Sequence, residues 1–112
     1  MQSLMVILCT APDEAVAARL AGSLVEARLA ACVNILPAVR SIYRWKGEVQ
    51  NESEVLMVIK TEASQFERVE AWLQANHPYD VPEVVGLAAE AVSADYGKWV
   101  ADSVALVNRK KD

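Results

Sequence analysis

Cys9, His77 and Glu83 are the side chains of this sequence best suited to chemistry. His77 is the only histidine, and it lies in the segment NHPYDVPEVV at 76–85 together with Glu83. A thiolate, an imidazole and a carboxylate are together ligands for borderline or soft cations such as zinc and copper. A cysteine paired with a histidine is also the basis of nucleophilic catalysis. No short motif holds all three residues, so either chemistry depends on the fold bringing them together.

Each of these residues also has an ordinary structural explanation. Pro78 disfavours a helical conformation for His77, so a helix before it must end there. A histidine at a helix C-terminus suits the negative end of the helix dipole. A cysteine at the end of a strand is more often a small buried apolar residue than a reactive group. Nucleophilic catalysis would need an oxyanion-stabilising group and a residue to orient the histidine, and the sequence indicates neither.

The hydrophobic pattern predicts four strands and three helices. The apolar run at 4–9 is typical of a buried strand, and Val16, Leu20 and Leu24 mark one face of the helix that follows. The elements expected in chain order are a strand at 4–9, a helix at 13–29, a long hairpin from 31 or 32 to 61 with its turn at 46–48, a helix at 64–76 with Ser64 and Glu67 as a capping box, a strand at 83–92, and a helix capped by Ser93 that extends to Val107. Pro37 interrupts the first arm of the hairpin, which indicates an edge strand or a bulge.

This β-α-β-β-α-β order with an extra C-terminal helix predicts an α+β fold of the ferredoxin-like split βαβ class. Right-handed crossovers give the strand order 4-1-3-2, with every strand antiparallel to its neighbours. The first strand then ends at Cys9, and the fourth begins at Glu83, at the same rim of the sheet. We therefore expect the end of the first strand and the loop 77–82 to meet there.

Length and composition indicate one compact domain spanning residues 1–112. The chain is 54% hydrophobic with a net charge of -4, and it has no basic cluster longer than the tail at 109–111, which argues against nucleic acid as a partner. It has no apolar stretch near the roughly 20 residues of a membrane span. We expect a cytoplasmic protein in which Cys9 and Cys32 are reduced thiols. No glycine-rich phosphate-binding motif is present.

Tyr43 and Trp45 are expected near the tip of the long hairpin, which a four-stranded core cannot cover. A long unpaired edge that carries apolar groups favours association. We therefore expect copies of the chain to assemble through these hairpins, with each arm extending a neighbour's sheet.

Four segments together resemble the CutA divalent-cation tolerance family. They are LCTAPDE at 8–14, EARLAACVNILPAVRSIYRWKGEVQNESEVLMVIKT at 26–61, HPYDVPE at 77–83 and DYGKWV at 95–100. The resemblance implies a ferredoxin-like subunit that forms a homotrimer, and a cytoplasmic, non-enzymatic protein linked to tolerance of copper and other divalent metals. It also implies copper ligands at Cys9 and His77. Where members of the family can have two consecutive histidines, this chain has Asn76 before His77, and Glu83 could complete a weaker site.

Two other functions remain open from the sequence. The resemblance extends to the architecture of PII-type signalling proteins, which implies a trimer that binds a small anionic metabolite between subunits. Lys60 and Arg44 are the candidate anion contacts for that function, although ordinary surface charges explain them as well. A hydrolase that uses Cys9 is the third alternative.

Overall fold

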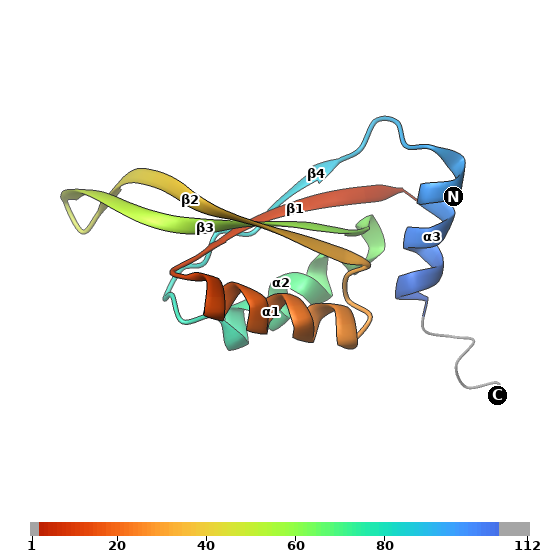
Figure 1. Ribbon diagram of the computed structural model, residues 1–112, viewed down its shortest axis with the longest axis horizontal. Helices are drawn as coiled ribbons and strands as arrows, with labels where there is room; N and C mark the ends of the chain where they lie inside the picture. The colour runs from red at the N-terminus through yellow and green to blue at the C-terminus, as the bar shows by residue number, and fades with distance from the viewer. Residues whose placement is uncertain (1–2, 106–112) are drawn as a thin grey trace.

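The computed structural model describes residues 3–105. These residues form, in chain order, β1 (Leu4–Ala11), α1 (Glu14–Glu26), β2 (Cys32–Trp45), β3 (Glu48–Glu62), a 3-10 turn (Ala63–Gln65), α2 (Phe66–Asn76), β4 (Val85–Ala88) and α3 (Ala94–Val104). Helices α1 and α2 lie on one face of the sheet (Figure 1). Helix α3 lies at the end of the sheet where β1 begins, and the hairpin of β2 and β3 projects beyond the opposite end.

The four strands lie in the order β2-β3-β1-β4, and every pair is antiparallel. This order is the predicted 4-1-3-2 read from the other edge, so the ferredoxin-like α+β class is confirmed. The ladder between β1 and β3 ends where Ala11 faces Val55. Beyond that pair, β2 and β3 continue as a two-stranded ribbon.

The main core lies between the sheet and the helices α1 and α2. Alternate residues of β1 and β3 point to that side, because successive side chains of a strand face opposite ways. Those that are completely or almost completely buried there are Ile7, Cys9, Ala11, Val55, Met57 and Ile59, and they pack with Leu20 and Leu24 of α1 and with Val69 and Leu73 of α2. Burying each valine, leucine, isoleucine or methionine side chain contributes about 1.5–3 kcal/mol to the stability of the fold.

Strands β1 and β4 end at different residues from those predicted. Strand β1 does not end at Cys9 but continues to Ala11, because β3 offers it hydrogen-bonding partners to Val55. Strand β4 spans only Val85–Ala88 and not 83–92, because it pairs with β1 only between Met5 and Leu8. Residues 90–92 lie beyond Leu4, where β1 begins, so the described part of the chain offers them no strand to pair with.

Helix α1 is shorter than the predicted 13–29. Asp13 caps it, and its side-chain oxygen Oδ1 accepts a hydrogen bond from the Val16 amide at 2.8 Å. The chain then leaves the helix through Arg28, whose φ of 61° is left-handed. The Leu29 amide donates to the carbonyl oxygen of Leu24, so the last turn closes on itself before β2 begins.

The predicted capping box of Ser64 and Glu67 is wrong. The residues 63–65 form a 3-10 turn that runs directly into α2, and no side chain caps the first turn. Gln65, at the N-cap position, already has a helical conformation. Ser64, the N-cap residue of the predicted box, lies inside the 3-10 turn and so lacks the extended conformation that the box requires.

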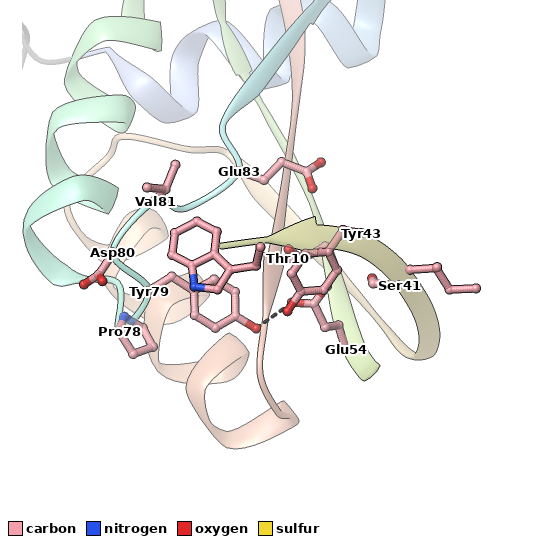
Figure 2. Close-up of a pocket in the computed structure, with 11 residues that line it drawn as sticks. Thr10, Ser41, Tyr43, Glu54, Pro78, Tyr79, Asp80, Val81 and Glu83 are labelled. Carbon is pink, nitrogen blue, oxygen red and sulfur yellow. Dashed lines mark hydrogen bonds between the residues drawn. The ribbon is translucent and has the colours of Figure 1, made fainter. Parts of the chain in front are cut away.

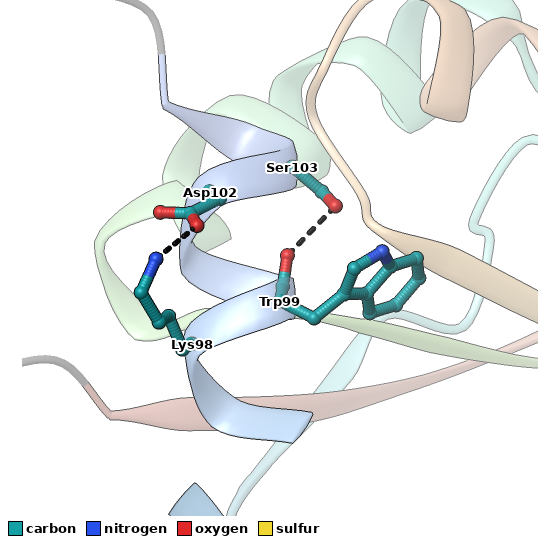
Figure 3. Close-up of polar contacts among 4 residues, drawn as sticks. All are labelled: Lys98, Trp99, Asp102 and Ser103. Atoms are coloured by element: carbon teal, nitrogen blue, oxygen red, sulfur yellow. Dashed lines mark hydrogen bonds and ion pairs between the residues drawn. The ribbon is translucent and has the colours of Figure 1, made fainter. Parts of the chain in front are cut away.

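Helix α3 begins as predicted, with the Ser93 hydroxyl accepting a hydrogen bond from the Tyr96 amide at 3.4 Å. Val100 and Val104 are buried against Leu4. Trp99, which directly precedes Val100 on the helix, is 48% exposed. The outer side of the helix has an exposed ion pair of Lys98 with Asp102 at 2.7 Å (Figure 3). The expected continuation to Val107 lies outside the described residues.

The hairpin follows its sequence signals closely. Strand β2 lies at the edge of the sheet, and its register with β3 shifts between Leu36 and Val39, so Pro37 has both of its predicted features. Lys46 and Gly47 form the two-residue turn with φ values of 51° and 81°, as a type I′ hairpin requires. Within residues 3–105, no helix combines the length and apolarity that crossing a bilayer requires.

Candidate functional site

The end of β1 and the loop 77–83 meet at one rim of the sheet, as the predicted topology required. His77 ends α2 in an extended conformation, which follows from the proline after it. Its ring is buried, and Nε2 lies 2.8 Å from the carbonyl oxygen of Thr10. Nδ1 accepts a hydrogen bond from the Tyr79 amide at 3.1 Å. His77 therefore joins the loop to the end of β1.

These two hydrogen bonds define the protonation of the imidazole. Nδ1 faces an amide donor and must accept, so the proton lies on Nε2 and is donated to the Thr10 carbonyl. Both ring nitrogens of His77 are then occupied by the backbone. In this arrangement His77 has no free lone pair to offer a cation or a substrate proton.

Cys9 lies on the core side of β1 and is completely buried. Burial, and then the charges of Glu83 and Glu54, raise the pKa of the Cys9 thiol from 9.0 to about 12. A metal-binding or nucleophilic cysteine needs the thiolate form, which a lowered pKa favours. At neutral pH, Cys9 is therefore a protonated apolar side chain of the core.

A metal ion does not fit Cys9, His77 and Glu83 as they are arranged. The thiol is protonated, the imidazole nitrogens are both engaged, and Glu83 is exposed on the loop. Among residues 3–105, no three or more histidine, cysteine, aspartate or glutamate side chains form a group that could hold an ion. The copper ligands implied by the resemblance remain a prediction that would require local rearrangement.

A groove of about 650 Å³ opens at the same rim, between the hairpin and the loop 77–83. Its walls combine aromatic rings with acids, and Figure 2 shows the residues of the loop facing those of the hairpin. The aromatic members are Tyr43, Trp45 and Tyr79, and the acids are Glu54, Asp80 and Glu83. The sequence predicted the loop 77–82, which contains Tyr79 and Asp80, and Glu83 at this rim, but it placed Tyr43 and Trp45 near the hairpin tip and gave no role to Glu54.

Glu54 is the central acid of the groove. It directly precedes Val55, which is the residue of β3 that faces the last residue of β1, so Glu54 lies just past the end of β1. It is only 7% exposed, and Oε2 accepts a hydrogen bond from the Tyr79 hydroxyl at 2.5 Å. The only signal for Glu54 in the sequence is its place directly before the apolar run 55–59. That position does not show that Tyr79 is its neighbour in the fold.

A second phenol and carboxylate pair lies beside the first. The Tyr43 hydroxyl donates to Oε1 of Glu52 at 2.7 Å. That hydrogen bond raises the pKa of Tyr43, while burial and then the bond to Glu54 raise that of Tyr79. Both phenols are therefore neutral donors over the physiological pH range, and the negative charge of the groove resides on its carboxylates.

The structure does not bring Lys60 and Arg44 together. Nζ of Lys60 lies 2.5 Å from Oδ1 of Asn34 on the sheet, and Arg44 donates to the Gly47 carbonyl oxygen near the hairpin turn at 3.4 Å. Neither residue lines the groove, whose charged side chains are all acidic. This arrangement offers no site for an anionic metabolite in the groove.

Fold and site together define a small ferredoxin-like protein with a projecting hairpin and an acidic, aromatic groove. The family model described as CutA1 divalent ion tolerance protein matches residues 5–103. The divalent-cation tolerance protein CutA of Pectobacterium atrosepticum is 49% identical over 96 residues, which are 86% of this chain and 87% of that protein. The chloroplastic protein CutA of Arabidopsis thaliana is 43% identical over 99 residues, which are 88% of this chain and 54% of that longer protein.

A solved structure agrees with these sequence matches. The divalent cation tolerance protein Cut A1 from Thermus thermophilus superimposes with a TM-score of 0.88 at 43% identity, covering 91% of this chain and 99% of that chain. The chain therefore belongs to the CutA1 divalent ion tolerance family.

Proposed function

We propose that this protein is a homotrimeric, non-enzymatic protein of divalent-cation tolerance, in which the groove at the rim binds a cation or a small ligand. The observation that carries the proposal is the uncovered hairpin. Beyond the end of β1, the two-stranded ribbon exposes 66% of Ile42 and 63% of Val49. An isolated two-stranded ribbon is at best marginally stable in water, so packing against another surface would stabilise it.

A second apolar surface lies on the sheet face opposite α1 and α2. Leu36, Val85 and Leu87 are each more than 40% exposed there. Helix α3 covers only the end of that face near Leu4 and Val6. Two uncovered apolar surfaces on one small chain favour self-association, and the family resemblance implies three copies.

The mass of the purified protein in solution tests the assembly. Light scattering is expected to give three times the 12.2 kDa chain mass. Ile42→Asp should shift the mass toward that of the monomer, because it places a charge in the proposed interface. Val25→Asp is the matched control, since Val25 is a similarly apolar exposed residue on α1. A monomeric parent protein, or a trimer that Ile42→Asp leaves intact, would contradict assembly through the hairpin.

We also propose that Cys9, His77 and Glu83 bind copper or another divalent cation as its ligands, after the site opens locally. The loop must release Nδ1 of His77, and the Cys9 thiol must lose its proton. Below a thiol pKa of about 12, proton release makes the apparent affinity rise about tenfold per pH unit. Calorimetric copper titrations of Cys9→Ala and His77→Ala should show weaker binding, whereas Cys32→Ala should bind as the parent protein does. Equal binding by all four proteins, or affinity independent of pH, would contradict these ligands.

A cytoplasmic location is part of the proposal. Cys9 and Cys32 are both free cysteines, as is usual in reducing compartments. Fractionation of cells that produce the tagged protein tests this location, and recovery from the membrane or an exported fraction would contradict it.

A further inference from the structure

The groove between the hairpin and the loop 77–83 has an unusual charge distribution. Glu54, Asp80 and Glu83 line it, and no lysine or arginine does. Glu54 is more than nine-tenths buried, yet its carboxylate accepts its hydrogen bond from the neutral phenol of Tyr79. The one ion pair within residues 3–105 joins Lys98 and Asp102 on α3, so no basic side chain of that region neutralises Glu54. A buried carboxylate without a positive partner favours a cationic ligand.

The spacing of these acids distinguishes between kinds of cation. Within the described residues, no three acidic, histidine or cysteine side chains are close enough together to hold a metal ion. All three carboxylates nevertheless line one groove of about 650 Å³. A single ion can contact only adjacent ligands, whereas an elongated molecule with separated positive charges can reach acids that are far apart. The groove therefore fits an extended organic cation better than a metal ion.

The remaining walls suit the body of such a molecule. Tyr43, Trp45 and Tyr79 contribute aromatic rings, and aromatic faces attract ammonium groups and pack against methylene chains. Trp45 already makes this kind of contact within the chain, because Nζ of Lys46 lies 5.8 Å from the centre of its ring. The Tyr79 hydroxyl is directed at the carboxylate of Glu54 (Figure 2). The Tyr43 hydroxyl is directed at the carboxylate of Glu52.

We propose that the groove binds an aliphatic diamine or polyamine, with its ammonium groups at Glu54, Asp80 and Glu83 and its methylene chain against the aromatic rings. The inference rests on the proposed ligand-binding role of the groove and names the class of that ligand. It does not depend on the copper ligands. Every lining residue comes from one chain, but the hairpin that forms one wall is also the proposed trimer interface, so in the trimer the groove lies beside a neighbouring copy.

Calorimetric titration of the full chain with putrescine and spermidine tests the proposal. Both amines should bind, spermidine more tightly because it has one more charge, and both should bind more weakly at high salt. Butanediol, which has the same chain length as putrescine but no charge, should not bind. Absence of binding by both amines, or equal binding of butanediol, would overturn the inference.

Variants locate the binding in the groove. Glu54→Gln keeps an oxygen that can accept from Tyr79 but removes the charge, and it should weaken spermidine binding about tenfold, the scale of one lost charged contact. Asp80→Asn should weaken it as well. Glu67→Gln is the matched control, since Glu67 is an exposed carboxylate of α2 outside the groove. If Glu54→Gln and Glu67→Gln bind spermidine equally, the amine binds elsewhere and the inference is wrong.

The same titrations separate this inference from the proposed function. Copper binding without amine binding overturns the polyamine site and leaves the metal proposal standing. Amine binding without copper binding does the reverse. Copper that competes with spermidine and depends equally on Glu54 would show a metal site in the groove, which would also overturn the inference.

Discussion

His77 and Cys9 show how the surroundings of one residue decide its chemistry. The imidazole could bind a cation, but it joins the loop 77–83 to Thr10 through both of its nitrogens. The thiol could be a nucleophile, but burial holds its proton to about pH 12. His77 therefore joins the loop to β1 and Cys9 packs in the core, which leaves the carboxylates of the groove as the groups available to a ligand.

The raised pKa of Cys9 predicts a loss of stability in alkali. The unfolded thiol releases its proton near its ordinary pKa of 9.0, whereas the folded thiol keeps it to about 12. The unfolded state then binds fewer protons, so the free energy of unfolding falls between these values, by at most about 1.4 kcal/mol per pH unit. Urea denaturation from neutral pH to above pH 9 measures it. Cys9→Ala should have a shallower decline and Cys32→Ala should not; equal slopes in all three proteins would contradict the assignment.

At the scale of elements, the position of β4 depends on the absence of a side chain. A Cβ atom added to Gly86 would lie 2.8 Å from Sδ of Met5 and 3.1 Å from the ring of Phe66. Strand β4, strand β1 and the start of α2 therefore approach one another closely. This contact holds the strand that follows the loop 77–83, and with it the position of Glu83.

Two glycine substitutions should change stability in opposite directions. Gly86→Ala must displace Met5 or Phe66, so it should destabilise the protein by about 1–3 kcal/mol. Gly22→Ala lies within α1, where an added Cβ meets nothing within 4 Å, so it should stabilise by about 0.5–1 kcal/mol. Urea denaturation of both variants measures the difference. A Gly86→Ala variant as stable as the parent protein would show that the close contact relaxes at no cost.

The described part of the molecule is elongated as a whole, with extents of 51 × 29 × 21 Å. The long axis follows the hairpin, which leaves the core where β1 ends (Figure 1). A compact chain of this size would be closer to spherical, because a projecting ribbon exposes surface without burying a core. The shape is explained if the ribbon packs against other copies.

The proposed trimer predicts that thermal stability depends on concentration. Unfolding must then also dissociate the chains, so the melting temperature should rise as the protein is concentrated. Differential scanning calorimetry over a wide dilution series measures it, with a slow scan rate so that dissociation keeps pace. The Ile42→Asp variant is the control and should melt at a temperature independent of dilution. A parent protein that behaves in the same way would contradict the coupling.

Local signals in the sequence determined most of the architecture. The apolar run of β1, the helical spacing of α1, Pro37 in the edge strand and Gly47 in the turn depend on neighbours in the chain, and the β-α-β-β-α-β order then leaves one strand order. That order correctly placed the loop 77–83 beside the end of β1. The ends of β1 and β4 were wrong because a strand continues only while a partner strand lies beside it.

Only the tertiary structure decided the chemistry of the rim. Cys9 faces the core, the His77 ring reaches the Thr10 carbonyl, and Glu54 lies under Tyr79, although these residues are far apart in the sequence. Residue types and spacing show which groups are available. Which hydrogen bonds those groups make, and whether a charge is left without a partner, depends on three-dimensional neighbours that no local pattern encodes.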